Sequence, residues 1–202
     1  MRFKLLVCAV GLCLFAPLPA EATVVLPLDF KQLTTKADVI LRGRVVALTS
    51  QWASDRNGID TLVTVQVTSY LKGDFGAQAT FRVAGGQIGR FRSVRVGAPV
   101  FREGEEVVLF LGGAGPVIPR IVGFNQGVYR VTTDPGSGVR VVMPPALTRE
   151  VTTPTPIVRG DPSRKPMPLA QFEAQVRSVL DGERPDRDAR RARARNNDKR
   201  LR

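Results

Sequence analysis

The stretch that decides the fold is Thr61-Leu62-Val63-Thr64-Val65-Gln66-Val67-Thr68, which carries the clearest two-residue period in the chain. Its odd-numbered positions are all small and β-branched, whereas its even-numbered positions are mostly polar. Successive side chains of a β-strand point to opposite faces, so this alternation predicts a half-buried antiparallel strand.

Other strand-like runs lie on both sides of this stretch. Residues 39–48 are rich in β-branched residues, and Gly43 among them predicts a bulge or a sharp bend. Residues 107–111 form a continuous apolar run that is expected to cross the core. Further extended segments are predicted at residues 79–83, 93–96, 120–124, 127–131 and 139–143. Several short strands separated by glycine and proline turns indicate a sandwich or a barrel, and not alternating βαβ units.

Two helices are expected at the ends of this strand region. Residues 28–37 place apolar side chains near helical spacing and predict one short helix. Residues 168–180 predict a second, amphipathic helix that ends at Gly182. Its apolar positions are Leu169, Phe172, Val176 and Leu180. Docking of this helix on the barrel is favoured over contact with a partner.

The glycine-rich segment 85–89 is expected to be a flexible break made of turn or bulge glycines. It lacks the lysine and the serine or threonine of a P-loop and precedes no clear helix, so a nucleotide site is not favoured there. No cofactor-binding residue is assigned.

The order of these segments resembles a group of uncharacterised exported bacterial proteins. The likeness is carried by Arg42-Gly43-Arg44-Val45-Val46, Tyr70-Leu71-Lys72-Gly73, the glycines of 85–89 and the segment 97–111. The barrel of that group is similar to the OB-like fold of tissue inhibitors of metalloproteases and of netrin modules. Over roughly residues 38–131, the resemblance implies a mainly β, antiparallel OB-like barrel with short N-terminal and C-terminal helices.

The inhibitors of that class place an N-terminal cysteine on a protease zinc and carry disulfides. Here the expected mature N-terminus is Thr23 and no cysteine follows it. The inhibitory residues therefore cannot be carried over, although a protease-interacting module that acts through a loop stays an alternative function.

Residues 1–22 have the features of a secretory signal peptide. Arg2 and Lys4 begin it, residues 5–18 are apolar, and Ala20-Glu21-Ala22 supplies small residues at a cleavage site. The apolar run is shorter than the roughly 20 residues of a membrane span. The chain is therefore expected to be exported to the periplasm or the extracellular space, with no transmembrane segment after cleavage.

Histidine is absent from the chain, and both cysteines, Cys8 and Cys13, lie in the expected signal peptide. The mature chain would therefore lack the commonest general base, the commonest zinc ligand and any thiol nucleophile. This composition favours a non-enzymatic binding or structural module, with no catalytic or metal residue assigned. The alternative is a histidine-free hydrolase or metal-dependent enzyme that uses carboxylates. The available candidates are Asp29, Asp38, Asp60, Glu103, Glu105 and Glu106.

The formal net charge of +12 is concentrated in two places. The first is the C-terminal end, which is expected to be a disordered tail. Between residues 189 and 202, its basic residues are Arg190, Arg191, Arg193, Arg195, Lys199, Arg200 and Arg202. This tail either attaches to an anionic envelope surface or only increases solubility. Nucleic acid is an unlikely partner, because export removes the chain from it and the tail has no aromatic residues to stack on bases.

The second concentration of positive charge comprises Arg82, Arg90, Arg92, Arg95 and Arg102. If several of these share one face they form an anion-binding surface, and otherwise a solvated basic face. The single tryptophan, Trp52, is either a core residue, the favoured interpretation, or an exposed ligand platform. Arg90, Arg92, Arg95 and Trp52 are the candidate contacts for an acidic envelope component or a protein partner.

The predicted organisation has four parts. They are a signal peptide (1–22), a β-barrel domain (23–145), a proline- and threonine-rich linker with the amphipathic helix (146–182) and the arginine-rich tail (183–202). The oligomeric state is not predicted.

Overall fold

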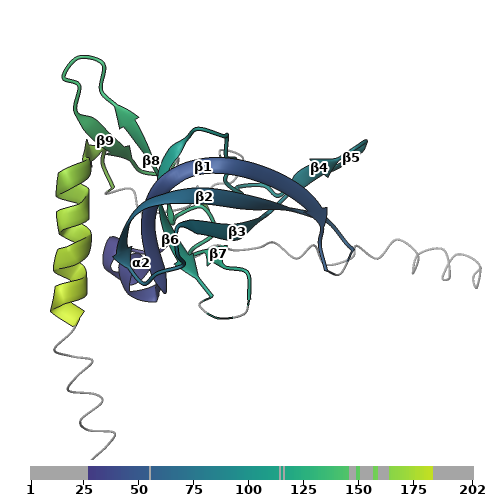
Figure 1. The fold of residues 1–202 in the computed structure, drawn as a ribbon, viewed down its shortest axis with the longest axis horizontal. Helices are drawn as coiled ribbons and strands as arrows, with labels where there is room; N and C mark the ends of the chain where they lie inside the picture. The colour runs from purple at the N-terminus through teal and green to yellow at the C-terminus, as the bar shows by residue number, and fades with distance from the viewer. Residues whose placement is uncertain are drawn as a thin grey trace, which may run out of the picture.

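The computed structural model describes residues 27–54, 56–113, 115, 117–145, 149–150, 157–158 and 164–183. These residues form a mainly β structure with a large mixed sheet and two helices (Figure 1). The elements are α2 (Phe30–Lys36), β1 (Val39–Trp52), β2 (Ile59–Lys72), β3 (Gln78–Ala84), β4 (Gly86–Ile88), β5 (Phe91–Ser93), β6 (Glu106–Gly112), β7 (Arg120–Ile121), β8 (Val128–Thr133), β9 (Arg140–Met143), β10 (Arg149–Glu150), β11 (Ile157–Val158), β12 (Met167–Pro168) and a C-terminal helix over residues 169–183. The expected signal peptide and the basic residues of the expected tail lie outside the described residues.

Strands β1 and β2 form a long, curved antiparallel hairpin (Figure 1). The strand predicted from residues 61–68 is confirmed, because it lies within β2 and buries Val63 and Val65 completely. Gln66, on the opposite face, is exposed. The two-residue alternation in the sequence therefore identifies the face of the hairpin that packs against the core.

Five strands of the main sheet pair in an order that begins and ends at β1. β2 pairs with β3, β3 with β7, β7 with β6, and β6 with β1. The β3–β7 pairing is parallel and makes the sheet mixed, whereas the other three pairings are antiparallel, as predicted. The chain enters β7 through β6, which runs antiparallel to it, and this reversal aligns β7 with β3. Beyond β6 the sheet continues through β8 and β9 to β12.

The predicted irregularity at Gly43 is confirmed, because the β1–β2 register shifts between Arg42 and Gly43. β1 pairs with β2 on one side and with β6 on the other at this point. A Cβ atom at Gly43 would lie 2.4 Å from the carbonyl oxygen of Gln66 and 2.5 Å from a methyl group of Val65. Only glycine allows β1 to bend so closely against β2.

The buried apolar residues form two clusters on opposite faces of β1 and β6. One contains Val63, Phe81, Val107 and Leu109, which come from β2, β3 and β6. The other contains Ile40, Val108 and Phe110 together with residues of both helices. The continuous apolar run predicted to cross the core thus belongs to β6, which contributes to both clusters.

The C-terminal helix docks on the sheet, as favoured from the sequence. Leu169, Phe172 and Val176 are buried in the second cluster. The ring of Phe172 packs 4.8 Å from that of Tyr129 and 5.5 Å from that of Phe30. The predicted stop at Gly182 is wrong, since the helix includes this residue and reaches residue 183. Gly182 is exposed in the last turn, where its cost to the helix is small.

The short N-terminal helix predicted over residues 28–37 is present as α2. Asp29 caps it by accepting a hydrogen bond from the backbone N–H of Gln32 at 2.6 Å. The Gln32 side chain in turn accepts from the backbone N–H of Asp29, which completes a capping box. Leu33 is fully buried, so α2 covers the same face of the sheet as the C-terminal helix.

Two predictions fail between β3 and β6. The glycine segment 85–89 is not a flexible break, because residues 86–88 form β4 and pair with β5. The strand predicted at residues 93–96 is instead β5 at Phe91–Ser93. The hairpin was not predicted, because the glycines of this segment indicate a loop. Its strands are also too short to show the two-residue alternation of a β-strand. β7 is also shorter than the predicted segment 120–124.

Candidate functional site

The β4–β5 hairpin projects from one end of the molecule, while the C-terminal helix lies at the other end (Figure 1). Its two-residue turn has Gly89 with φ of 54° at the first central position, followed by Arg90. Glycine at that position suits the turns that match the twist of paired strands. The sequence Ile88-Gly89-Arg90-Phe91 therefore sets Arg90 at the tip of the hairpin.

The base of the hairpin is fixed to the end of the β1–β2 hairpin. The Thr61 hydroxyl donates to the carbonyl oxygen of Gly85 at 2.7 Å, and the Gly85 N–H donates to that of Ile59 at 2.8 Å. A Cβ atom at Gly86 would lie 2.7 Å from the Thr61 hydroxyl and 2.8 Å from the Ser50 hydroxyl. The backbone at the start of β4 therefore passes so close to side chains of β1 and β2 that only glycine fits at position 86. We call this close approach the Gly86 crossing.

Two clefts of about 610 and 500 Å³ lie at this end and share part of their walls. The shared lining includes Val83, Ser93 and Arg95. The larger cleft lies between the β1–β2 turn and the ends of β3 and β7, and Phe124 lies on its wall with φ of 68°. A positive φ is uncommon for a bulky residue, and residues held in such strained conformations cluster at functional sites.

The larger cleft is lined by more cations than anions. Among its described lining residues, Arg82, Arg95 and Arg120 carry positive charge and Asp60 carries the one negative charge. Arg82 and Asp60 form an ion pair at 3.5 Å, and both side chains are mostly buried. The Nε–H of Arg82 is buried and has no hydrogen-bond partner. The cleft thus has an excess of guanidinium groups, the donors best suited to carboxylates and phosphates.

Trp52 is not a core residue, so the favoured interpretation from the sequence is wrong. Its side chain is 48% exposed and packs edge-on against Phe91, with the ring centroids 5.5 Å apart. The guanidinium of Arg90 lies 5.2 Å from the centre of the Phe91 ring. Trp52 ends β1 beyond the core, where the β4–β5 hairpin is its neighbour.

The arginines identified from the sequence are distributed over different environments. Arg90, Arg92 and Arg95 are exposed on the hairpin and the segment that follows it. Arg82 is mostly buried beside Asp60, and Arg102 pairs with Glu105 at 3.7 Å. The structure therefore places Arg90 near Phe91 and Trp52, places Arg95 with Arg82 in the larger cleft, and pairs Arg102 with a neighbouring glutamate.

Sequence reasoning missed Arg120 and the apolar residues around the hairpin. Arg120 enters the cleft through its pairing with Arg82 across β7 and β3, a contact between distant parts of the chain. Phe91 and Val94 were not identified because the segment has no helical or strand period. An apolar residue between arginines, as in Arg90-Phe91-Arg92, is the one available local indication.

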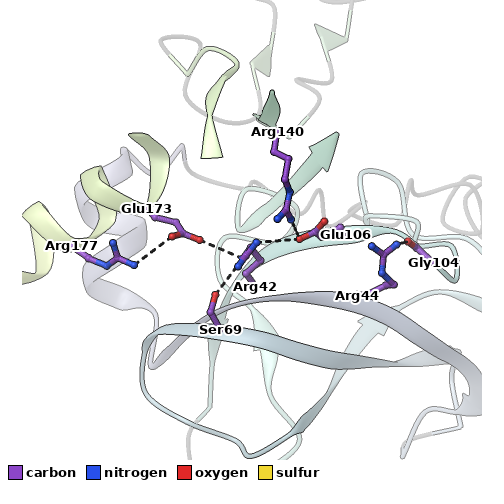
Figure 2. A network of polar contacts seen from close by, with 8 residues as sticks. All are labelled: Arg42, Arg44, Ser69, Gly104, Glu106, Arg140, Glu173 and Arg177. Atoms are coloured by element: carbon purple, nitrogen blue, oxygen red, sulfur yellow. Dashed lines mark hydrogen bonds and ion pairs between the residues drawn. The ribbon is translucent and has the colours of Figure 1, made fainter. Parts of the chain in front are cut away.

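A second group of charged residues lies at the helix end (Figure 2). Arg42 contacts Glu106 at 3.5 Å, Glu173 at 3.4 Å and the hydroxyl of Ser69 at 3.2 Å. Arg140 also pairs with Glu106, and Arg177 pairs with Glu173 at 3.4 Å. This network joins β1 and β6 to the C-terminal helix, and each of its two glutamates contacts two arginines.

The other candidate carboxylates are bound in separate places. Asp29 caps α2, Asp38 accepts a hydrogen bond from the Gly113 N–H at 2.8 Å, and Glu105 pairs with Arg130 at 3.7 Å. No group of three or more histidine, cysteine, aspartate or glutamate side chains suited to a metal ion occurs in the described residues. These carboxylates therefore have local structural contacts and do not converge on one cleft.

Two shifted pKa values lie in turns away from the cleft. Burial raises the pKa of Tyr70, whose hydroxyl donates to the carbonyl oxygen of Gly76 at 2.7 Å. Hydrogen bonds from the side chain and backbone of Ser137 lower the pKa of Asp134. Both groups stabilise turns, one between β2 and β3 and the other between β8 and β9.

Comparison of the chain with protein-family models, curated proteins and solved structures found no match. No helix in the described ranges combines the length and apolarity needed to span a bilayer. The functional assignment therefore rests on the geometry of the hairpin end.

Proposed function

We propose that this chain is an exported, non-enzymatic binding module that holds acidic groups of an envelope component or of a partner protein. The observation that carries this proposal is the excess of arginine over carboxylate around the larger cleft. Export to the periplasm or the extracellular space is inferred from residues 1–22. The basic residues of the C-terminal end would add general attraction to the same anionic surroundings.

The proposed scaffold is an OB-like barrel made of β1, β2, β3, β7 and β6. Its support is the order of pairing, which runs through these strands and returns to β1, with a parallel contact between the third and the last strand along the chain. Five-stranded Greek-key barrels of the OB type have this connectivity. They bind ligands on the face of their second and third strands and at the adjoining loops.

The position of the cleft agrees with that binding face. Ala53 and Asn57 belong to the turn between β1 and β2, Asp60 to β2, and Arg82 to β3, and all four line the cleft. Shared architecture does not by itself assign a ligand. The ligand class is inferred instead from the guanidinium groups, which form paired, charge-assisted hydrogen bonds with carboxylates.

Titration calorimetry with a trimer of galacturonic acid, a carboxylate-bearing sugar, tests this proposal. Maltotriose serves as the neutral probe. We expect the acidic trimer to bind in a salt-sensitive manner and the double variant Arg95→Gln/Arg120→Gln to weaken binding about tenfold or more. The matched control is Arg177→Gln, which removes an exposed arginine at the helix end.

Equal binding of the neutral sugar, or unchanged affinity in the double variant, would contradict the proposed role of the cleft. A polyglutamate peptide in the same calorimeter separates the two kinds of partner. Preference for the peptide over the sugar would assign the cleft to a protein partner with acidic side chains.

A further inference from the structure

Exposed apolar side chains are concentrated at the hairpin end. Nine large hydrophobic side chains are exposed in the described residues, and five of them are Trp52 and residues of the hairpin or of the segment that follows it: Phe91, Val94, Val96 and Val100. The three valines are between 69% and 73% exposed. Isolated exposed apolar residues are ordinary on protein surfaces, but a concentration in one short segment beside an exposed tryptophan indicates a contact surface.

We call this surface the hairpin tip and define it by Trp52 and residues 90–100. Its base is held by the Gly86 crossing and the hydrogen bonds of Gly85 described above. Residues 90–93 are therefore presented at the end of the molecule by the paired strands β4 and β5, and residues 94–100 continue the chain from β5 (Figure 1). When the backbone is already fixed, little conformational entropy is lost as the apolar side chains bind.

The charge of the hairpin tip is uniformly positive. Residues 90–100 contain Arg90, Arg92 and Arg95 and no aspartate or glutamate. These three arginines form no ion pair within the described part of the chain. Arginines and apolar residues are interspersed through residues 90–96, and the guanidinium of Arg90 lies 5.2 Å from the centre of the Phe91 ring.

We propose that the hairpin tip docks on an anionic lipid surface. In such a complex Trp52 and Phe91 would lie at the level of the head groups, where aromatic side chains are favoured. The valines would enter the boundary of the acyl chains, and the arginines would contact lipid phosphates. A lipid surface fits better than an acidic protein, because it accepts extended apolar side chains without needing matching pockets.

This inference goes beyond the proposed function, because the hairpin tip would bind lipid even if the cleft held no ligand. Docking through the tip would place the mouth of the cleft beside the head groups. The two proposals use different variants: Arg90, Arg92, Phe91 and Val94 for the tip, and Arg95 and Arg120 for the cleft.

The test uses Trp52, which is the one tryptophan in the chain. The full chain is mixed with vesicles of equimolar phosphatidylcholine and phosphatidylglycerol, or of phosphatidylcholine alone. We expect the Trp52 emission to shift to shorter wavelength with the anionic vesicles, and lipids brominated on their acyl chains to quench it. Attachment through either terminus alone would sediment the chain with the vesicles but leave Trp52 unquenched.

Two variants divide the apolar from the electrostatic contribution. Phe91→Ser/Val94→Ser is expected to abolish quenching by brominated lipid. Arg90→Gln/Arg92→Gln is expected to weaken partitioning about thirtyfold, at about a few-fold to tenfold per arginine. Val139→Ser is the matched apolar control, since Val139 is exposed away from the tip, and Arg177→Gln is the matched charge control.

Unquenched Trp52 on anionic vesicles, or quenching that persists in Phe91→Ser/Val94→Ser, would overturn the proposal. A Trp52 response to a polyglutamate peptide but not to vesicles would also overturn it and assign the tip to an acidic protein. All four variants replace exposed side chains, and unchanged thermal unfolding would show that each remains folded.

Discussion

The two ends of this molecule use the same residue types in opposite ways. At the helix end, Arg42 is mostly buried and contacts Glu106 and Glu173, and phenylalanine rings pack in the core. At the hairpin end, Arg90, Arg92 and Arg95 are exposed and a phenylalanine packs against an exposed tryptophan. Net charge and apolar content therefore do not distinguish the two ends of this chain, whereas the pairing of each side chain does.

This difference predicts that the helix end contributes mainly to stability and the hairpin end mainly to binding. The helix end joins segments that are distant along the chain, so its side chains should determine the free energy of unfolding. The hairpin end has few contacts beyond its anchored base, so its side chains should alter binding and leave unfolding nearly unchanged. Matched substitutions at the two ends can confirm or break this division.

The largest difference is expected between two phenylalanines. Phe172→Ala should lower the free energy of unfolding by about 3–5 kcal/mol, because Phe172 is buried among Phe30, Phe110 and Tyr129. Phe91→Ala should lower it by at most about 1 kcal/mol, through loss of the contact with Trp52. Urea unfolding followed by circular dichroism measures both. Similar losses at the two positions would break the division between the ends.

Arginines at the two ends provide the second comparison. Arg42→Met should lower the free energy of unfolding by about 2 kcal/mol, because it leaves two partly buried glutamates without their shared partner. Arg92→Met should change it by less than about 0.5 kcal/mol. Denaturant titration of both variants provides the measurement. An effect of Arg42→Met no larger than that of Arg92→Met would show that the network does not hold the helix to the sheet.

The helix end was partly predictable from the sequence. The apolar positions of residues 168–180 indicated a docked amphipathic helix, because helical period survives in a segment of that length. The network around Arg42 was not predictable, since Glu106 and Glu173 come from distant segments. The order of charged residues along the chain shows no pattern that would indicate which glutamates contact Arg42.

The hairpin end was less predictable. Arg90, Arg92 and Arg95 were identified as a basic group, and in the structure Arg92 and Arg95 line the smaller cleft while Arg90 lies over the ring of Phe91, which packs against Trp52. The hairpin that presents them was mistaken for a flexible break, because three-residue strands carry no period. Its position depends on the fit of Gly86 against Ser50 and Thr61, which is a tertiary contact.

A comparison of two glycines tests how the hairpin tip is positioned. Gly86→Val should lower the free energy of unfolding by about 1–3 kcal/mol, because its side chain would overlap Ser50, Thr61 and Ile59. It should also displace the hairpin and change the near-ultraviolet circular dichroism of Trp52. Gly89→Ala is the control at the tip, where nothing lies within 4 Å of the added Cβ atom.

Gly89 has a positive φ, so Gly89→Ala should cost about 1 kcal/mol of turn stability while leaving the Trp52 spectrum close to that of the unchanged chain. A spectrum altered equally by both substitutions would mean that the turn, and not the Gly86 crossing, positions the hairpin.

The smallest effect sharpens the comparison within the helix end itself. Arg177 lies 60% exposed and pairs with Glu173 four residues earlier on the same helix. Arg177→Gln should therefore lower the free energy of unfolding by about 0.3–0.5 kcal/mol at low salt and by less at high salt, where the exposed pair is screened.

Unfolding titrations of Arg177→Gln at two salt concentrations, run beside Arg42→Met, measure this difference. If both variants lost similar stability and both losses vanished with salt, Arg42 would behave as a surface cation. The contrast with the hairpin end would then rest on the buried rings alone.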